Sequence, residues 1–151
     1  MRRASAGASQ AGRLTVATVQ SAVKARLDQY WTRCEVRFPN PSDPNLPNDG
    51  FTPLLVVTFP VGRANQITIG APGENVFRDE GGIRFSLFVP RGFGTEPWDP
   101  WLEELRTLFR ARQFDGVTTY APSPAVIDDR ETEGTHVPIS FAVPYDADLI
   151  G

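Results

Sequence analysis

The chain has 151 residues, about the size of one domain built around a single hydrophobic core. Hydrophobic residues make up 40% and charged residues 22%, which excludes a disordered chain, and 13 glycines with 14 prolines argue against a helical bundle. The net charge of -3 hides an asymmetry, since residues 1–37 hold seven basic and two acidic side chains and residues 113–151 hold one basic and seven acidic. This asymmetry fits contact with nucleic acid, copies that meet through complementary surfaces, or pairing of the two ends within one copy.

The first thirteen residues are small, polar or basic apart from Met1, and they include Arg2, Arg3 and Arg13 but no acidic residue. Such a composition is typical of a chain end that does not join the core. We therefore predict a flexible basic N-terminal arm over residues 1–13 and a single domain over residues 14–151.

The first predicted element is a helix over residues 14–33, because large apolar side chains recur there every three or four residues. Residues 34–38 alternate as a short strand does, and four prolines within residues 39–50 then predict a long loop. A loop of this length is either simple slack or a contact with a partner or another subunit.

The next predicted strands flank a polar segment. Residues 53–60 form an almost continuous apolar run and predict a central strand, while residues 83–90 alternate apolar and polar side chains. Residues 67–70 can continue the sheet, whereas residues 71–82 are rich in glycine and charge. We expect a recognition loop over residues 63–79.

A second helix is predicted with Asp99 as its N-cap and Pro100 at its first position, and Gly116 can serve as its stop. Short strands near residues 117–120 and 125–127, an acidic turn at 128–134 and a long strand at 136–145 follow. Pro138 and Pro144 cannot donate to a ladder, so this last strand is expected at an edge or interrupted.

Residues that commonly carry catalysis are scarce. Cys34 is the only cysteine and His136 the only histidine, so neither a Cys/His metal cluster nor a serine triad has evident partners. Gly92-Phe93-Gly94 is followed by Pro97 where a dinucleotide fingerprint needs glycine. We predict no enzymatic activity, no cofactor and no metal site, and, because no apolar run is long enough to cross a membrane, a soluble protein.

The order of several motifs carries a resemblance. They are a helix ending at Tyr30-Trp31, the Phe38-Pro39-Asn40 loop, a strand at residues 54–59, Phe88-Val89-Pro90 followed by Gly92 and Gly94, a helix with Leu102, Leu105, Leu108 and Phe109, and the closing Val137-Pro138-Ile139 and Val143-Pro144-Tyr145. Together they cover roughly residues 14–145. This pattern resembles the tail terminator, or tail-completion, proteins of long non-contractile phage tails and gene transfer agents.

The resemblance implies an α+β fold (α/β sandwich-like), with a mixed, largely antiparallel sheet and two main helices on one face. It implies a virion structural protein that forms a homo-hexameric ring on the head-proximal end of the tail tube, stops tube polymerisation and joins the tail to the head-neck. Expected partners are further copies of the chain, the tail tube protein and a neck connector or stopper protein. Genomic DNA passes through the channel without sequence-specific binding, and the protein is assembled in the host cytoplasm into the virion.

Ring or partner contacts are expected in the arm, in the loops over residues 40–49 and 63–79, and in the acidic turn, which lines either the channel or a subunit interface. The candidate residues are Arg2, Arg3, Arg13, Asn40, Asp43, Asn48, Asp49, Arg63, Arg78, Asp79, Asp128, Asp129, Glu131 and Glu133.

Two alternatives stay open. A head-completion or stopper protein of the neck has a similar size and also forms rings. A small metal-dependent hydrolase is conceivable because the acidic residues of the turn could bind a hard cation, although their spacing matches no calcium loop.

Overall fold

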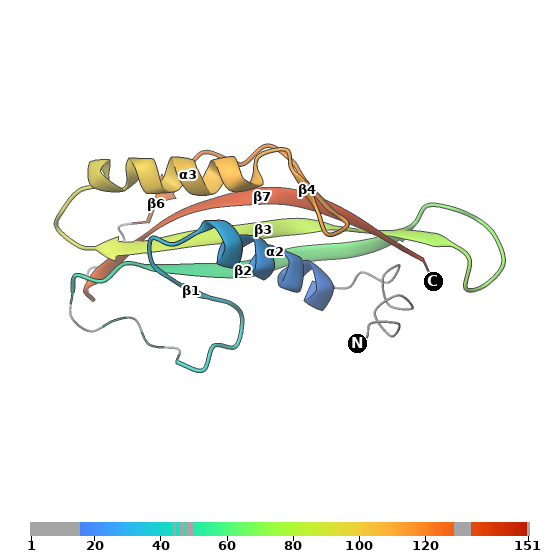
Figure 1. Cartoon of the computed structure of the whole chain (residues 1–151), viewed down its shortest axis with the longest axis horizontal. Helices are drawn as coiled ribbons and strands as arrows, with labels where there is room; N and C mark the ends of the chain where they lie inside the picture. The colour runs from blue at the N-terminus through green and yellow to red at the C-terminus, as the bar shows by residue number, and fades with distance from the viewer. Residues whose placement is uncertain (1–15, 44, 46, 48–49, 129–133, 151) are drawn as a thin grey trace.

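The computed structural model describes residues 16–43, 45, 47, 50–128 and 134–150 (Figure 1). In chain order these form α2 (Val16–Tyr30), β1 (Glu35–Arg37), β2 (Leu54–Gln66), β3 (Val76–Pro90), the 3-10 helix η1 (Glu96–Trp98), α3 (Asp99–Phe109), β4 (Gln113–Phe114), β5 (Val117–Thr119), β6 (Val126–Ile127) and β7 (His136–Ile150). The predicted arm over residues 1–13 lies outside the described residues. Neither α2 nor α3 has the length and apolar character needed to cross a membrane.

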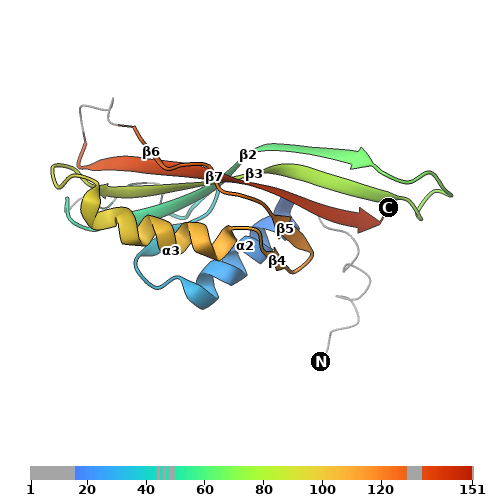
Figure 2. The same ribbon diagram turned by 90° about the horizontal axis from the view of Figure 1, so that it is seen from above.

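One sheet organises these elements. Its strand order is β1-β2-β3-β7-β5-β4, and β6 also pairs with β7. Among the strands of the described residues, β1–β2 is the one parallel pair; β2–β3, β3–β7, β7–β5, β7–β6 and β5–β4 are antiparallel. Figure 2 shows both helices on the same face of the sheet. The α+β expectation, with a mixed, largely antiparallel sheet and two main helices on one face, is therefore confirmed.

The core lies between the helices and the sheet. On β3, alternate side chains from Ile83 to Val89 face the helices and are buried. The Phe85 ring lies at the centre, with its centroid 4.8 Å from that of Phe109 on α3 and 5.2 Å from that of Phe141 on β7. Burial of these rings removes a large apolar area from water and fixes the helices to one face.

The strands β2 and β3 are longer than the sequence predicts, so the expected loop over residues 63–79 is wrong. Residues 63–66 and 76–79 are strand, and only residues 67–75 form the connection. A shift of register between Thr58 and Val61 accommodates Pro60, which has no N–H to donate. The polar residues 76–79 are strand because β3 pairs with the C-terminal part of β7, as far as Val76 opposite Ile150.

Helix α3 begins and ends differently from the prediction. Trp98 is the residue that precedes the helix, and Asp99 is its first residue, so Asp99 is not the N-cap. The helix ends at Phe109, where the Thr119 hydroxyl donates to the carbonyl oxygen at 2.6 Å. Gly116 does not end the helix; with φ +82° it makes the turn between β4 and β5, a conformation that favours glycine.

The last strand, β7, is not an edge strand, because β3 pairs with it along its whole length. The backbone groups of Pro138 and Pro144 point away from β3. On that side of β7 their carbonyl oxygens accept hydrogen bonds from the N–H groups of Asp128 and Tyr120, both at 3.0 Å. On that side, within the described part of the chain, only β5 and β6, of three and two residues, pair with β7. The two prolines, which have no N–H to donate, thus lie where the pairing of β7 with its short neighbours is already interrupted.

Candidate interaction sites

The loop that joins β2 to β3, residues 67–75, is ordered by its own hydrogen bonds. The Asn75 side chain donates from Nδ2 to the carbonyl oxygens of Gly70 and Ala71, both at 3.3 Å. Asn75 is only 8% exposed, so these bonds are shielded from water. We call this segment the hairpin loop; it lies at one end of the molecule, beyond the helices (Figure 1).

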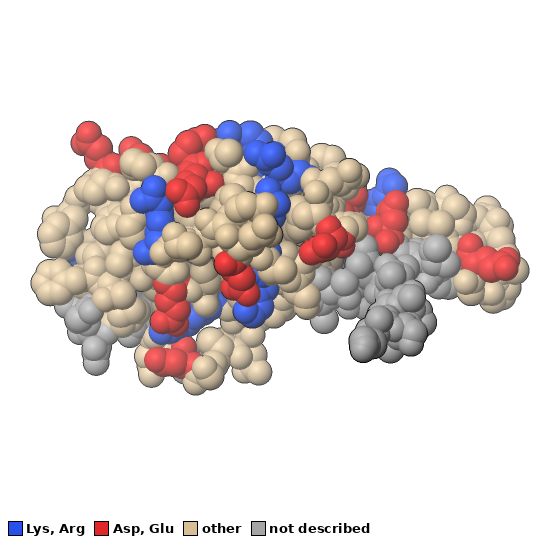
Figure 3. Space-filling model, in the orientation of Figure 1, with Lys and Arg blue, Asp and Glu red and all other residues tan. Residues whose placement is uncertain are grey.

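The hairpin loop presents apolar side chains to solvent. Ile69 is 100% exposed and Ile67 is 45% exposed. Glu74 follows in the same loop, is exposed, and has no ion-pair partner among the described residues. Figure 3 shows acidic atoms at the tip of this end of the molecule, with basic atoms farther back towards the helices. An ordered loop that combines an exposed apolar side chain with a carboxylate has the features of a protein-binding site.

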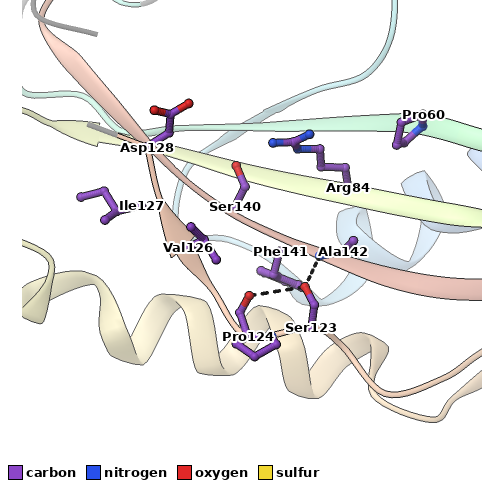
Figure 4. A pocket seen from close by; sticks show the side chains of 10 residues that line it. All are labelled: Pro60, Arg84, Ser123, Pro124, Val126, Ile127, Asp128, Ser140, Phe141 and Ala142. Atoms are coloured by element: carbon purple, nitrogen blue, oxygen red, sulfur yellow. Dashed lines mark hydrogen bonds between the residues drawn. The ribbon is translucent and has the colours of Figure 1, made fainter. Parts of the chain in front are cut away.

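A groove of about 490 Å³ lies on the face of the sheet that has no helices (Figure 4). Its floor comes from β2, β3 and β7, and its wall comes from residues 123–128, which include β6. The Ser123 hydroxyl accepts a hydrogen bond from the Ala142 backbone N–H at 2.9 Å and so fixes the wall to β7. We call this feature the groove.

The groove is apolar on one side and cationic on the other. Val126 and Ile127, in the wall, are 65% and 42% exposed. Arg84, on β3, points into it and has neither a hydrogen bond nor an ion pair among the described residues. An unpaired guanidinium opposite exposed apolar side chains suits a partner that carries both a carboxylate and an apolar group.

Eight of the candidate contact residues lie outside the described part of the chain. They are Arg2, Arg3, Arg13, Asn48, Asp49, Asp129, Glu131 and Glu133. Asp128, the first acidic residue of the predicted turn, is described and lines the groove next to β6.

Asn40 and Asp43 lie in the long loop that follows β1. Asn40 adopts a left-handed backbone with φ +58°, and the Asp43 carboxylate accepts a hydrogen bond from the Asn45 N–H at 3.0 Å. The Arg37 guanidinium lies 3.8 Å from Asp43 and also donates to the Asn45 carbonyl oxygen. Arg37 therefore holds this part of the loop against the end of β1.

The other three candidates, Arg63, Arg78 and Asp79, lie on strands and do not form one site. Arg63 is 3.4 Å from Glu80, and Arg78 makes two hydrogen bonds to Asp148, at 2.8 and 3.2 Å, on the helix-free face. The Arg78 guanidinium lowers the pKa of Asp148. Asp79 alternates to the other face, where partial burial raises the pKa of its carboxyl.

The two side chains with catalytic potential have structural surroundings. His136 is buried, with Nε2 2.7 Å from the Thr52 carbonyl oxygen and Nδ1 2.7 Å from the Thr135 hydroxyl. Burial raises the pKa of the Cys34 thiol, the opposite of what a nucleophile requires. Within the described residues, no three His, Cys, Asp or Glu side chains are grouped so as to hold a metal ion. The lack of an enzymatic activity stays a prediction.

Ile69 and the groove residues other than Asp128 were not among the sequence candidates. The available signal for Ile69 is an apolar residue inside a polar, glycine-rich stretch, which also fits a short strand. Arg84 alternates with core residues and is expected to face away from the core, but the sequence does not reveal that the short β6 borders it there.

No protein-family model matches the chain, and no curated protein matches its sequence. A solved structure whose name states no function superposes with a TM-score of 0.56, over 89% of this chain and 96% of the other, at 19% sequence identity. At this identity the likeness shows a shared fold and carries no information about activity.

Proposed function

We propose that the protein is a virion structural protein that forms a homo-hexameric ring at the head-proximal end of a tail tube. The ring stops tube polymerisation and joins the tail to the head-neck. Its work is contact with other proteins rather than catalysis, and genomic DNA passes through its channel without sequence-specific binding.

The observation that carries this proposal is the exposed hairpin loop. Asn75 fixes the loop, yet Ile69 contributes nothing to the core because its side chain is fully exposed. An apolar side chain in such a position gains hydrophobic stabilisation when another molecule covers it. The loop therefore supports a role in assembly.

The arrangement of surfaces also fits a ring. The hairpin loop lies at one end of β2 and β3, while the groove lies on the helix-free face nearer the other end (Figures 1 and 4). Different surfaces on identical copies give heterologous contacts, which close into a ring when the rotation between copies allows it. The segment after the long loop, where Phe51 is 71% exposed, offers a further apolar surface for the tube or neck protein.

The decisive experiment is a measurement of the mass and shape of the purified protein. We expect a six-fold multiple of the 16.6 kDa chain and, by electron microscopy, a ring with a central hole. Added to elongating tail tubes, this protein is expected to stop their growth.

Other outcomes identify the alternatives. Binding only to portal-bearing heads, with tubes still growing, would indicate a stopper protein. Turnover on an esterase or phosphodiester panel, together with a metal-dependent rise in melting temperature, would contradict the structural role and indicate a hydrolase.

A further inference from the structure

We propose that the hairpin loop of one copy inserts into the groove of a neighbouring copy. In this contact Ile69 packs against Val126 and Ile127 of the neighbour, and Glu74 pairs with its Arg84. The inference rests on the proposed ring, because it names the two surfaces through which each subunit meets its two neighbours.

The hairpin loop is held by hydrogen bonds within the chain before it meets a neighbour. The Asn75 amide bonds at 3.3 Å and the 2.8 Å bond from the Val76 N–H to the Thr68 hydroxyl hold its backbone in one shape. An ordered loop loses little conformational freedom on binding, so the burial of Ile69 is not offset by a large entropy cost. Burial of the Ile69 side chain then supplies the apolar part of the contact.

The groove offers an apolar surface for Ile69 and a positive charge for Glu74, on opposite sides. Its apolar wall lies on the β6 side, and its cation, Arg84, lies on the β3 side (Figure 4). The acidic residue that also lines the groove, Asp128, follows β6. A carboxylate entering the groove is therefore attracted to the β3 side, which fixes the direction in which the loop enters.

Charge complementarity selects a second copy as the occupant. Among the described residues, neither Glu74 nor Arg84 has an ion-pair partner within its own chain. The two groups have opposite charge and each adjoins exposed apolar side chains. One contact between copies covers both apolar surfaces and pairs both charges.

The same contact cannot form within one copy. Arg84 lies nine positions after Asn75 along β3, a distance of about 30 Å at about 3.3 Å per residue. β3 pairs with β7 along this whole stretch, from Val76 to Pro90, so the hairpin cannot fold back without breaking the ladder. The loop of one chain reaches only the groove of another.

A charge exchange tests the contact. Glu74→Arg and Arg84→Glu are each expected to weaken self-association at least about tenfold, measured by mass photometry over a dilution series. The double variant carries both exchanged charges and is expected to recover most of the loss. Ile69→Asn is expected to abolish assembly, because it removes the apolar part of the contact.

Arg63 provides the matched control. It lies on the same sheet face as Arg84 but outside the groove, so Glu74→Arg combined with Arg63→Glu has the same net charge as the exchanged pair and should remain weak. Circular dichroism and thermal unfolding show whether each variant keeps its fold. All these positions are exposed, so unfolding is not expected.

The outcomes separate this contact from the ring itself. Rings that form equally well from wild type, Ile69→Asn and Glu74→Arg would overturn the contact and leave the proposed function standing. Failure of the exchanged pair to recover while the Arg63 control recovers would also overturn it. A wild-type chain that stays monomeric at every concentration and on tube ends would overturn both.

Discussion

The long strands pass through two regions that differ in what their side chains do. In the body, the part of the sheet under α2 and α3, alternate residues of β3 from Ile83 to Val89 are buried among aromatic rings. In the extension, residues 61–66 of β2, 76–82 of β3 and 144–150 of β7, the helix-free face carries ion pairs such as Arg78 with Asp148. The same ladder holds both regions, but hydrophobic burial stabilises chiefly the body. The extension is thereby free to present charged and apolar groups to other molecules.

The largest expected effect is in the centre of the body. Phe85→Ala removes a fully buried ring in contact with Phe109 and Phe141 and should lower the free energy of unfolding by about 3–5 kcal/mol. Urea unfolding measures the change. Arg63→Ala in the extension should change stability by about 0.5 kcal/mol or less. Equal losses for the two variants would contradict the comparison.

A smaller effect is expected where α3 joins β5. Thr119→Val keeps the side-chain shape but removes the hydroxyl that donates to the Phe109 carbonyl oxygen at 2.6 Å, in a residue that is 1% exposed. We expect a loss of about 1–3 kcal/mol in urea unfolding, because the carbonyl loses its buried donor. Thr118→Val, whose hydroxyl accepts only an exposed bond from Gln113, is the control and should have little effect.

In the extension the ion pair of Arg78 and Asp148 should give a small effect that depends on pH. Because Arg78 lowers the pKa of Asp148 in the folded state, the pair stabilises the fold above the ordinary carboxyl pKa of about 4, and this stabilisation is lost as the pH falls through the lowered value. Asp148→Asn should therefore be less stable than wild type at neutral pH, most clearly in low salt, and equal to it in strong acid. A difference that persists in acid would refute this origin. Asp115→Asn, at an exposed turn, is the control.

The smallest expected effect has the opposite sign. Partial burial raises the pKa of Asp79, so the ionised carboxylate opposes folding once the pH exceeds the ordinary carboxyl pKa, and most fully above the raised value. Asp79→Asn should therefore raise the thermal unfolding midpoint at neutral pH, and the gain should vanish as the pH falls below about 4. A lower midpoint at neutral pH would mean that the carboxylate has a favourable partner.

Local patterns in the sequence predict the body well and the extension poorly. The alternation from Ile83 to Val89 and the apolar spacing of α3 are dictated by burial, so they are visible in one chain segment at a time. Residues 76–82 have no such pattern, and they are strand because β7 continues to Ile150 and pairs with them. Local patterns in residues 76–82 therefore cannot predict this strand, because its partner, β7, is more than sixty residues away in the sequence.

The interaction sites depend on distant pairing even more strongly. Arg84 and Val126 are far apart in sequence and border one groove only because β3 and β6 both pair with β7. The charge of Arg84 is visible in the sequence, but only the fold shows that it has no ion-pair partner among the described residues. Candidate residues chosen for charge in apparent loops, such as Arg63 and Arg78, instead proved to be strand residues with acidic neighbours.

The prolines of the sheet also protect the protein from forming fibres. On the outer side of β7, Pro138 and Pro144 supply carbonyl oxygens but no donors, and on β2 the irregularity at Pro60 interrupts the strand. A sheet from another molecule that approached either border would find its row of hydrogen bonds broken. The borders of the sheet therefore favour contacts made through side chains over stacking of strand on strand without limit.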